Sequence, residues 1–168
     1  MRVVIGDGEP ELHVGEEFDW FATEFWSDVL LTQTVERTKS ALLIANNYYR
    51  VNAEVIYVSQ DPEQGAACIL DFGIKAISEE GGFLGIPLPP GCPEGYYVTG
   101  EVRLQPPLCT ANHPHDLGHR WRVNRIFADL TDFSSYPGDI SEVSYQNVPG
   151  TDSVESGSYV LHCSDLNA

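Results

Sequence analysis

Apolar and polar side chains alternate along the middle of the chain, which is the pattern of β-strands that bury one face. Residues 51–59 alternate in this way, and residues 67–77 do so again after the segment QDPEQG. Asp, Pro and Gly in that segment are typical of a turn, so the two runs predict a β-hairpin. A third alternating run covers residues 96–104. The four prolines within residues 87–93 predict a loop before it, because proline has no amide proton to donate to a sheet.

Shorter apolar runs add further strand candidates. They lie at residues 2–5, 121–128, 142–147 and 158–163. Short strands that are separated repeatedly by Gly and Pro are typical of a sandwich or a small barrel.

Two stretches fit more than one kind of element. Residues 18–29 place aromatic side chains at helical spacing but also alternate, and their aromatic content favours a strand. Residues 34–45 are compatible with a short helix capped by Thr34, although Arg37 stands where a capping box carries Glu or Gln. We therefore expect residues 1–168 to form a single mainly-β domain: a small barrel or sandwich, an OB-like barrel among the alternatives, with at most one or two short helices.

Net charge is the strongest global feature of the sequence. The 168 residues include 25 acidic and nine basic ones, which gives a formal net charge of -16, while 42% hydrophobic residues suffice for a packed core. Such a charge repels nucleic acid and anionic membranes, and it speeds association with a basic protein partner. Solubility alone is the competing explanation.

The sequence also indicates a compartment. No apolar run approaches the roughly 20 residues that span a bilayer, and the first residues lack the basic, apolar and small regions of a signal peptide. The four cysteines contain no Cys-x-x-Cys pair, and because the sequence shows no export signal we expect reduced thiols, not two disulfides, and a cytoplasmic protein. The oligomeric state stays open.

The segment CTANHPHDLGH at residues 109–119 is the one candidate for metal chemistry. Its possible ligands for zinc are Cys109, His113, His115 and His119. On a helix, the two last histidines would share a face, with Asp116 in the place of a metalloprotease glutamate. Gly and the strand-like continuation of the chain argue against that helix, and the spacing matches no usual structural zinc site. A polar loop rich in turn-forming residues is the alternative.

Three arginines follow this segment and account for a third of all basic residues. Arg120 and Arg122 share one face if the segment is a strand, and Arg125 lies just beyond. An arginine row suits anions such as carboxylates and phosphates, which makes these residues an anion-binding hypothesis. The alternative is internal pairing with an acidic row on a neighbouring strand.

No catalytic signature accompanies these features. The chain has no Gly-x-Ser-x-Gly motif, and its glycine-rich segments do not follow the strand–loop–helix order that binds phosphate. We therefore lean against an enzyme and name no catalytic residue.

The leading hypothesis is a small acidic binding protein, of the inhibitor or immunity type, that neutralises a basic enzyme such as a nuclease. Aromatic anchors inside an acidic rim suit such an interface. The expected contact residues are Glu16, Glu17, Asp19, Trp20, Glu24, Trp26 and Asp28. The alternatives are a metal-dependent or metal-stabilised protein that uses the 109–119 cluster, and a β-barrel that binds a small ligand.

Overall fold

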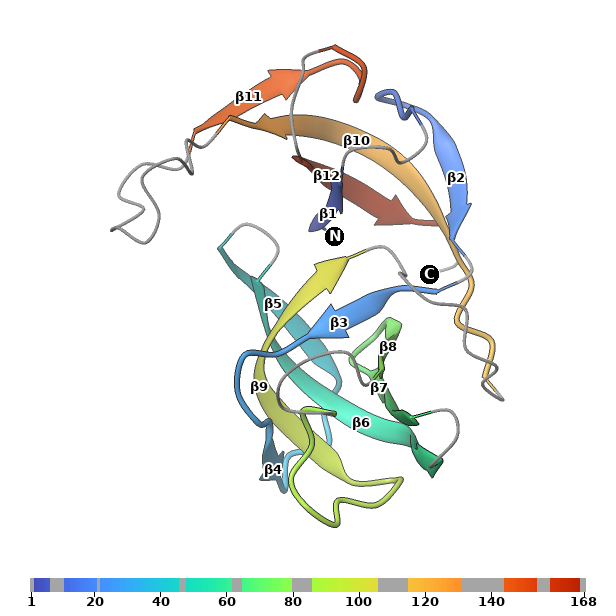
Figure 1. The fold of residues 1–168 in the computed structure, drawn as a ribbon, viewed down its shortest axis with the longest axis vertical. Helices are drawn as coiled ribbons and strands as arrows, with labels where there is room; N and C mark the ends of the chain where they lie inside the picture. Colours follow the sequence, from blue (N-terminus) through green and yellow to red (C-terminus); the bar gives the residue numbers. More distant parts are fainter. Residues whose placement is uncertain are drawn as a thin grey trace. The chain divides into compact units, whose positions relative to one another are not determined.

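The computed structural model describes residues 2–6, 11–20, 22–45, 48–61, 65–79, 86–105, 115–130, 144–153 and 158–166. Every regular element in these stretches is a β-strand (Figure 1). The chain divides into two compact units. Unit 1 comprises Met1–Asp19 and Arg120–Ala168, and unit 2 comprises Trp20–His119. The mainly-β fold is thus confirmed, and a single domain stays a prediction.

Unit 2 contains a closed five-stranded barrel. Its strands are β3 (Glu24–Trp26), β6 (Tyr48–Asp61), β7 (Gly65–Asp71), β8 (Lys75–Glu79) and β9 (Tyr97–Gln105). Each strand pairs with the next in the order β3–β9–β6–β7–β8, and the parallel pairing of β8 with β3 closes the ring. A small barrel is therefore confirmed, with the strand number of an OB-type barrel.

Two further strands extend the barrel sheet. Strand β4 (Thr32–Thr34) pairs with the first residues of β9, whereas β3 pairs with the last residues of β9. Strand β5 (Ser40–Ala45) pairs with the first half of β6. These two strands are the ends of the seven-stranded order.

The barrel core contains the apolar positions that the alternation picked out. Val51, Ala53 and Val55 on β6 are at most 1% exposed, as are Val98 and Val102 on β9. The hairpin at residues 51–77 and the strand at 96–104 are confirmed, although the run predicted as one strand at 67–77 is two. Asp71 accepts a hydrogen bond from the amide of Gly73, whose φ of 100° turns the chain between β7 and β8.

The two ambiguous stretches are both extended. Residues 18–29 supply β2 (Glu17–Trp20) and β3, so the preference for a strand is confirmed, with a break between them. The short helix considered for residues 34–45 is wrong, because that stretch ends in strand β5. Before β5, the buried Asn52 side chain donates hydrogen bonds to the carbonyls of Glu36 and Thr38, which occupies groups that a helix would need.

Unit 1 is built around one sheet. Its strand order is β1 (Arg2–Gly6), β12 (Ser158–Asp165), β10 (His119–Asp129) and β11 (Tyr145–Val148), and β2 also pairs with β10. These strands confirm the runs predicted at residues 2–5, 121–128 and 158–163, whereas the run predicted at 142–147 is a strand only from residue 145, and residues 142 and 143 lie outside the described residues. Trp121, Val123 and Ile126 on β10 are buried against neighbours such as Leu161 on β12.

The described part of the chain holds no helix long and apolar enough to cross a membrane. Cys68, Cys92 and Cys163 form no disulfides, and Cys109 lies outside the described residues. Burial raises the pKa of the Cys68 thiol well above its ordinary value and that of Cys163 to about 12. These two thiols are therefore poor nucleophiles.

Candidate functional site

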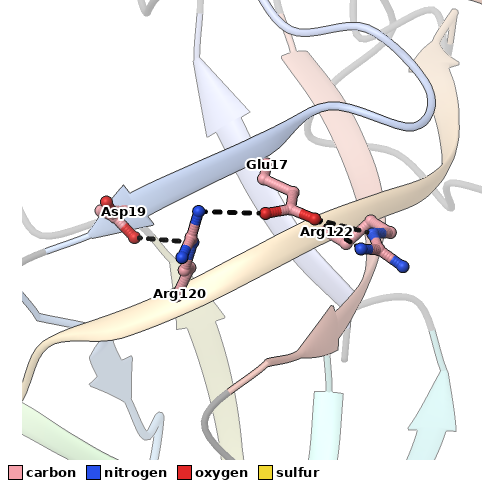
Figure 2. A network of polar contacts seen from close by, with 4 residues as sticks. All are labelled: Glu17, Asp19, Arg120 and Arg122. Atoms are coloured by element: carbon pink, nitrogen blue, oxygen red, sulfur yellow. Dashed lines mark hydrogen bonds and ion pairs between the residues drawn. The ribbon is translucent and has the colours of Figure 1, made fainter.

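Two arginines of β10, Arg120 and Arg122, contact acidic side chains of the paired strand β2 in unit 1. Figure 2 shows Glu17 between Arg120 and Arg122, with Asp19 beside Arg120. Glu17 Oε1 accepts hydrogen bonds from Nε and a terminal nitrogen of Arg122, and Glu17 Oε2 lies 3.2 Å from Arg120 Nη2. Arg120 Nε lies 3.8 Å from Asp19 Oδ1. Both guanidiniums are thus occupied within the unit, which is the internal pairing that the sequence offered as the alternative to an anion site.

Glu17 is the centre of this network, and its neighbours change the pKa of its carboxyl group. The hydrogen bonds from Arg122 lower the pKa of Glu17 below its ordinary value. Desolvation acts in the opposite direction, and the charges of Arg122 and Arg120 add to the lowering. The carboxylate form is therefore favoured more in the folded chain than in the unfolded chain.

This lowered pKa predicts a pH-dependent contribution to stability. A group whose pKa is lower in the folded state stabilises fully above its unfolded pKa of about 4.3, and the contribution is lost as the pH falls through the folded value. The difference in free energy of unfolding between wild type and Glu17→Gln should therefore be constant near neutral pH and shrink in acid. Urea denaturation at several pH values measures it, and Arg122→Gln is the matched background. If Glu17→Gln changes the free energy of unfolding with the same pH dependence in the Arg122→Gln background as in the wild type, Arg122 is not the cause of the lowered pKa of Glu17.

Arg125 differs from the other two arginines. It pairs with no carboxylate among the described residues, and it lines a shallow open hollow in unit 1. The other lining residues are Val14, Asn124, Asn147, Val148 and Pro149. Of the three arginines predicted to bind anions, it is the one whose guanidinium is not already engaged by an acid of the described chain.

The expected contact residues fall in both units. Glu16, Glu17 and Asp19 belong to unit 1, while Glu24 and the other later residues belong to unit 2. Asp19 presents 80% of its side chain to solvent, whereas Glu24 is buried and accepts a hydrogen bond from Gln105. Glu24 lies on β3, between β8 and β9 in the barrel wall, so little of its side chain is accessible to a partner.

The two remaining aromatic candidates and Asp28 complete this set. Trp26 is half-buried on β3, and Asp28 pairs with Arg103 at 2.8 Å. Trp20 ends β2, and its side chain lies outside the described residues.

Two histidines of the 109–119 segment, His115 and His119, lie in a described stretch that is not helical. Residues 115–118 precede β10 without forming a helix, and Asp116 accepts a hydrogen bond from the amide of Gly118. His115 packs edge-on against Tyr57, with ring centroids 5.7 Å apart, and His119 begins β10. Cys109 and His113 lie outside the described residues, so the four proposed zinc ligands are not placed together.

A different cluster offers metal-ligating atoms in the described part of unit 1. Ligand atoms of Glu11, His13 and Asp152 lie within 4.8 Å of one another, and all three side chains are exposed. A β-bridge joins His13 to Gly150. A Cβ at position 150 would lie 2.5 Å from both His13 Nδ1 and Asp152 Oδ1, so glycine leaves room for this approach. One imidazole and two carboxylates are ligands for a divalent cation, although exposed groups of this kind are common without one.

Sequence reasoning missed this cluster, because its members are far apart in the chain. Backbone hydrogen bonds between residues 12–14 and 149–151 bring the two segments together. Nothing local in the sequence signals that contact.

Comparisons with protein-family models, curated proteins and solved structures found no match to this chain. Function must therefore be argued from the charges and surfaces of the two units.

Proposed function

We propose that the protein is a small acidic cytoplasmic binding protein of the inhibitor type, which neutralises a basic protein such as a nuclease. The observation that carries this proposal is the distribution of ion pairs. Five of the nine cationic side chains pair with carboxylates inside their own unit: Lys39, Arg50, Arg103, Arg120 and Arg122. More than half of the cations are thus engaged internally, whereas the acids outnumber all the cations by 16.

Part of the acidic excess gathers on one region of unit 1. Glu11, Glu16 and Asp152 are exposed, and none of them pairs with a Lys or Arg among the described residues. Glu16 accepts a hydrogen bond from the amide of His13, which keeps its carboxylate beside the segment that carries Glu11. Exposed carboxylates that pair with no lysine or arginine of their own chain are the groups that a lysine or arginine of a basic partner can engage.

The test is binding and inhibition with a defined probe. We expect a ribonuclease of high isoelectric point to bind the protein at low salt and to lose activity in the complex, whereas an acidic ribonuclease does neither. Calorimetry measures the affinity, and hydrolysis of an RNA substrate measures the inhibition. If a panel of basic nucleases keeps full activity in excess protein and no binding is detected, the proposed function is wrong.

Paired charge variants locate the contact. Glu16→Gln with Asp152→Asn should weaken binding about tenfold, because each removed carboxylate is exposed on unit 1 and pairs with no Lys or Arg among the described residues. Glu94→Gln with Asp116→Asn changes the net charge equally but at exposed acids of unit 2, and it should have less than about a twofold effect. Equal weakening by the two pairs would show that net charge, and not this region of unit 1, drives binding.

A further inference from the structure

Strand β5 forms an unpaired apolar edge in unit 2. It is the last strand in the order β4–β9–β3–β8–β7–β6–β5, and among the described strands it pairs with β6 alone (Figure 1). An edge strand presents unpaired backbone N–H and C=O groups, which can pair with another chain.

The side chains of residues 40–44 on β5 are exposed as well. Leu42, Leu43 and Ile44 are 65%, 38% and 44% exposed. Consecutive side chains of a strand point to opposite faces, so both faces of β5 are open to solvent. The residues just before β5 are exposed too: every residue from 35 to 44 is exposed.

This segment is nevertheless held in place. Five residue pairs connect β5 to β6. Asn52 anchors the backbone just before β5 through the carbonyls of Glu36 and Thr38, and Lys39 Nζ lies 2.7 Å from Glu54 and 2.8 Å from Asp71. The strand is therefore presented in an extended form before any partner arrives.

The usual protection of an edge is weak here. Proteins commonly protect edge strands with charges, prolines, bulges or a covering segment. Ser40–Ala45 contains no charge and no proline, and its only irregularity is a register shift between Leu43 and Ala45. The opposite end of the sheet, β4, is a polar Thr-Gln-Thr. An apolar edge that is ordered but unprotected is suited to receiving a strand.

We propose that β5 is a docking strand, which binds an extended apolar segment of the basic partner as an added β-strand. The identity of the occupant rests on the proposed function and on charge. A second copy of this chain would bring a charge of -16 against -16, whereas a cationic partner is attracted. Charges beside β5 are compensated locally, because Lys39 pairs with Glu54 and Asp71, and Arg50 pairs with Glu101.

Strand addition can be tested with a peptide probe. The probe is a capped peptide of nine residues that alternates lysine and valine, and its controls are an N-methylated twin and a twin with glutamate for lysine. We expect amide NMR shifts on β5 and β6 with the first peptide. Backbone N-methylation removes the ladder hydrogen bonds and should weaken binding at least about tenfold. Undiminished binding of the N-methylated twin, or no binding of the first peptide, overturns the proposal.

Matched variants separate β5 from general charge. Leu42→Lys with Ile44→Lys should weaken the lysine–valine peptide at least about tenfold, because apolar contacts are lost on the strand. Val29→Lys with Leu30→Lys adds the same charge at side chains that are 61% and 47% exposed outside β5, and it should leave binding within about twofold. Thermal melts verify that both variants fold. Equal weakening by the two pairs overturns the docking strand.

The same variants distinguish this proposal from the proposed function. If the basic ribonuclease binds in a salt-dependent manner but is insensitive to the β5 variant, the docking strand is wrong and the proposed function stands. If the peptide binds at β5 and no basic nuclease binds, the proposed function is wrong and the strand-addition site stands. Light scattering that finds a dimer, which the β5 variant separates, identifies a second copy as the occupant and overturns the proposal.

Discussion

Replacing Phe25 with alanine is expected to lower the free energy of unfolding by about 3–5 kcal/mol, the usual cost of emptying a large aromatic site in a core. Phe25 is fully buried on β3, the strand that closes the barrel between β8 and β9. Its backbone pairs with Leu104, so the side chain cannot leave the core without loss of that register. Urea denaturation measures the change. Phe25→Leu keeps most of the volume and should cost less than about 1.5 kcal/mol.

The same variant tests whether the two units form one cooperative domain. If residues 1–168 unfold as a single unit, Phe25→Ala lowers hydrogen-exchange protection equally at Val102 on β9 and at Val123 on β10. Loss of protection confined to β9 would show that unit 2 unfolds alone, and the single-domain expectation would then be wrong.

Alternation predicted most strands because it is a local property of two-residue period. Val51, Ala53 and Val55 show it, and each is buried. Closure of the barrel was beyond this reasoning, because Glu24 pairs with Ile77 across 53 positions of the chain. Two elements were predicted wrongly: the short helix considered for residues 34–45 and the single strand at residues 67–77. In both, the alternation or spacing of apolar residues did not reveal what ends or holds the segment. Asn52 holds the backbone before β5, and a turn at Gly73 divides one alternating run into two strands.

The network of Arg120, Arg122 and Glu17 was likewise predictable only in part. Arg120 and Arg122 are two residues apart, so the sequence indicated a shared face if the segment is a strand, and it offered an acidic partner row as the alternative to an anion site. Which acids would face them did not follow, because Glu17 reaches Arg122 from 105 positions away. The exposure of Leu42 and Ile44 is equally unreadable from sequence, since apolar residues in a strand ordinarily predict burial.

Association with a basic ribonuclease is expected to slow by on the order of a hundredfold as salt rises from about 10 mM to about 1 M. Over this range the Debye length falls from about 30 Å to about 3 Å, which removes long-range attraction between a chain of charge -16 and a cationic partner. Stopped-flow fluorescence measures the association and dissociation rate constants separately. Electrostatic steering acts on the first, so the dissociation rate constant should change much less.

The salt series also separates steering from docking at β5. Glu16→Gln with Asp152→Asn should flatten the dependence of the association rate constant on salt, because it removes two exposed carboxylates that pair with no Lys or Arg among the described residues. Leu42→Lys with Ile44→Lys should chiefly raise the dissociation rate constant, because short-range apolar contacts determine how long a complex lasts. Val29→Lys with Leu30→Lys is the control for the added charge and should reproduce any effect on association that charge alone causes. An association rate constant that is indifferent to salt would exclude steering by net charge, and with it the reason for expecting a basic partner.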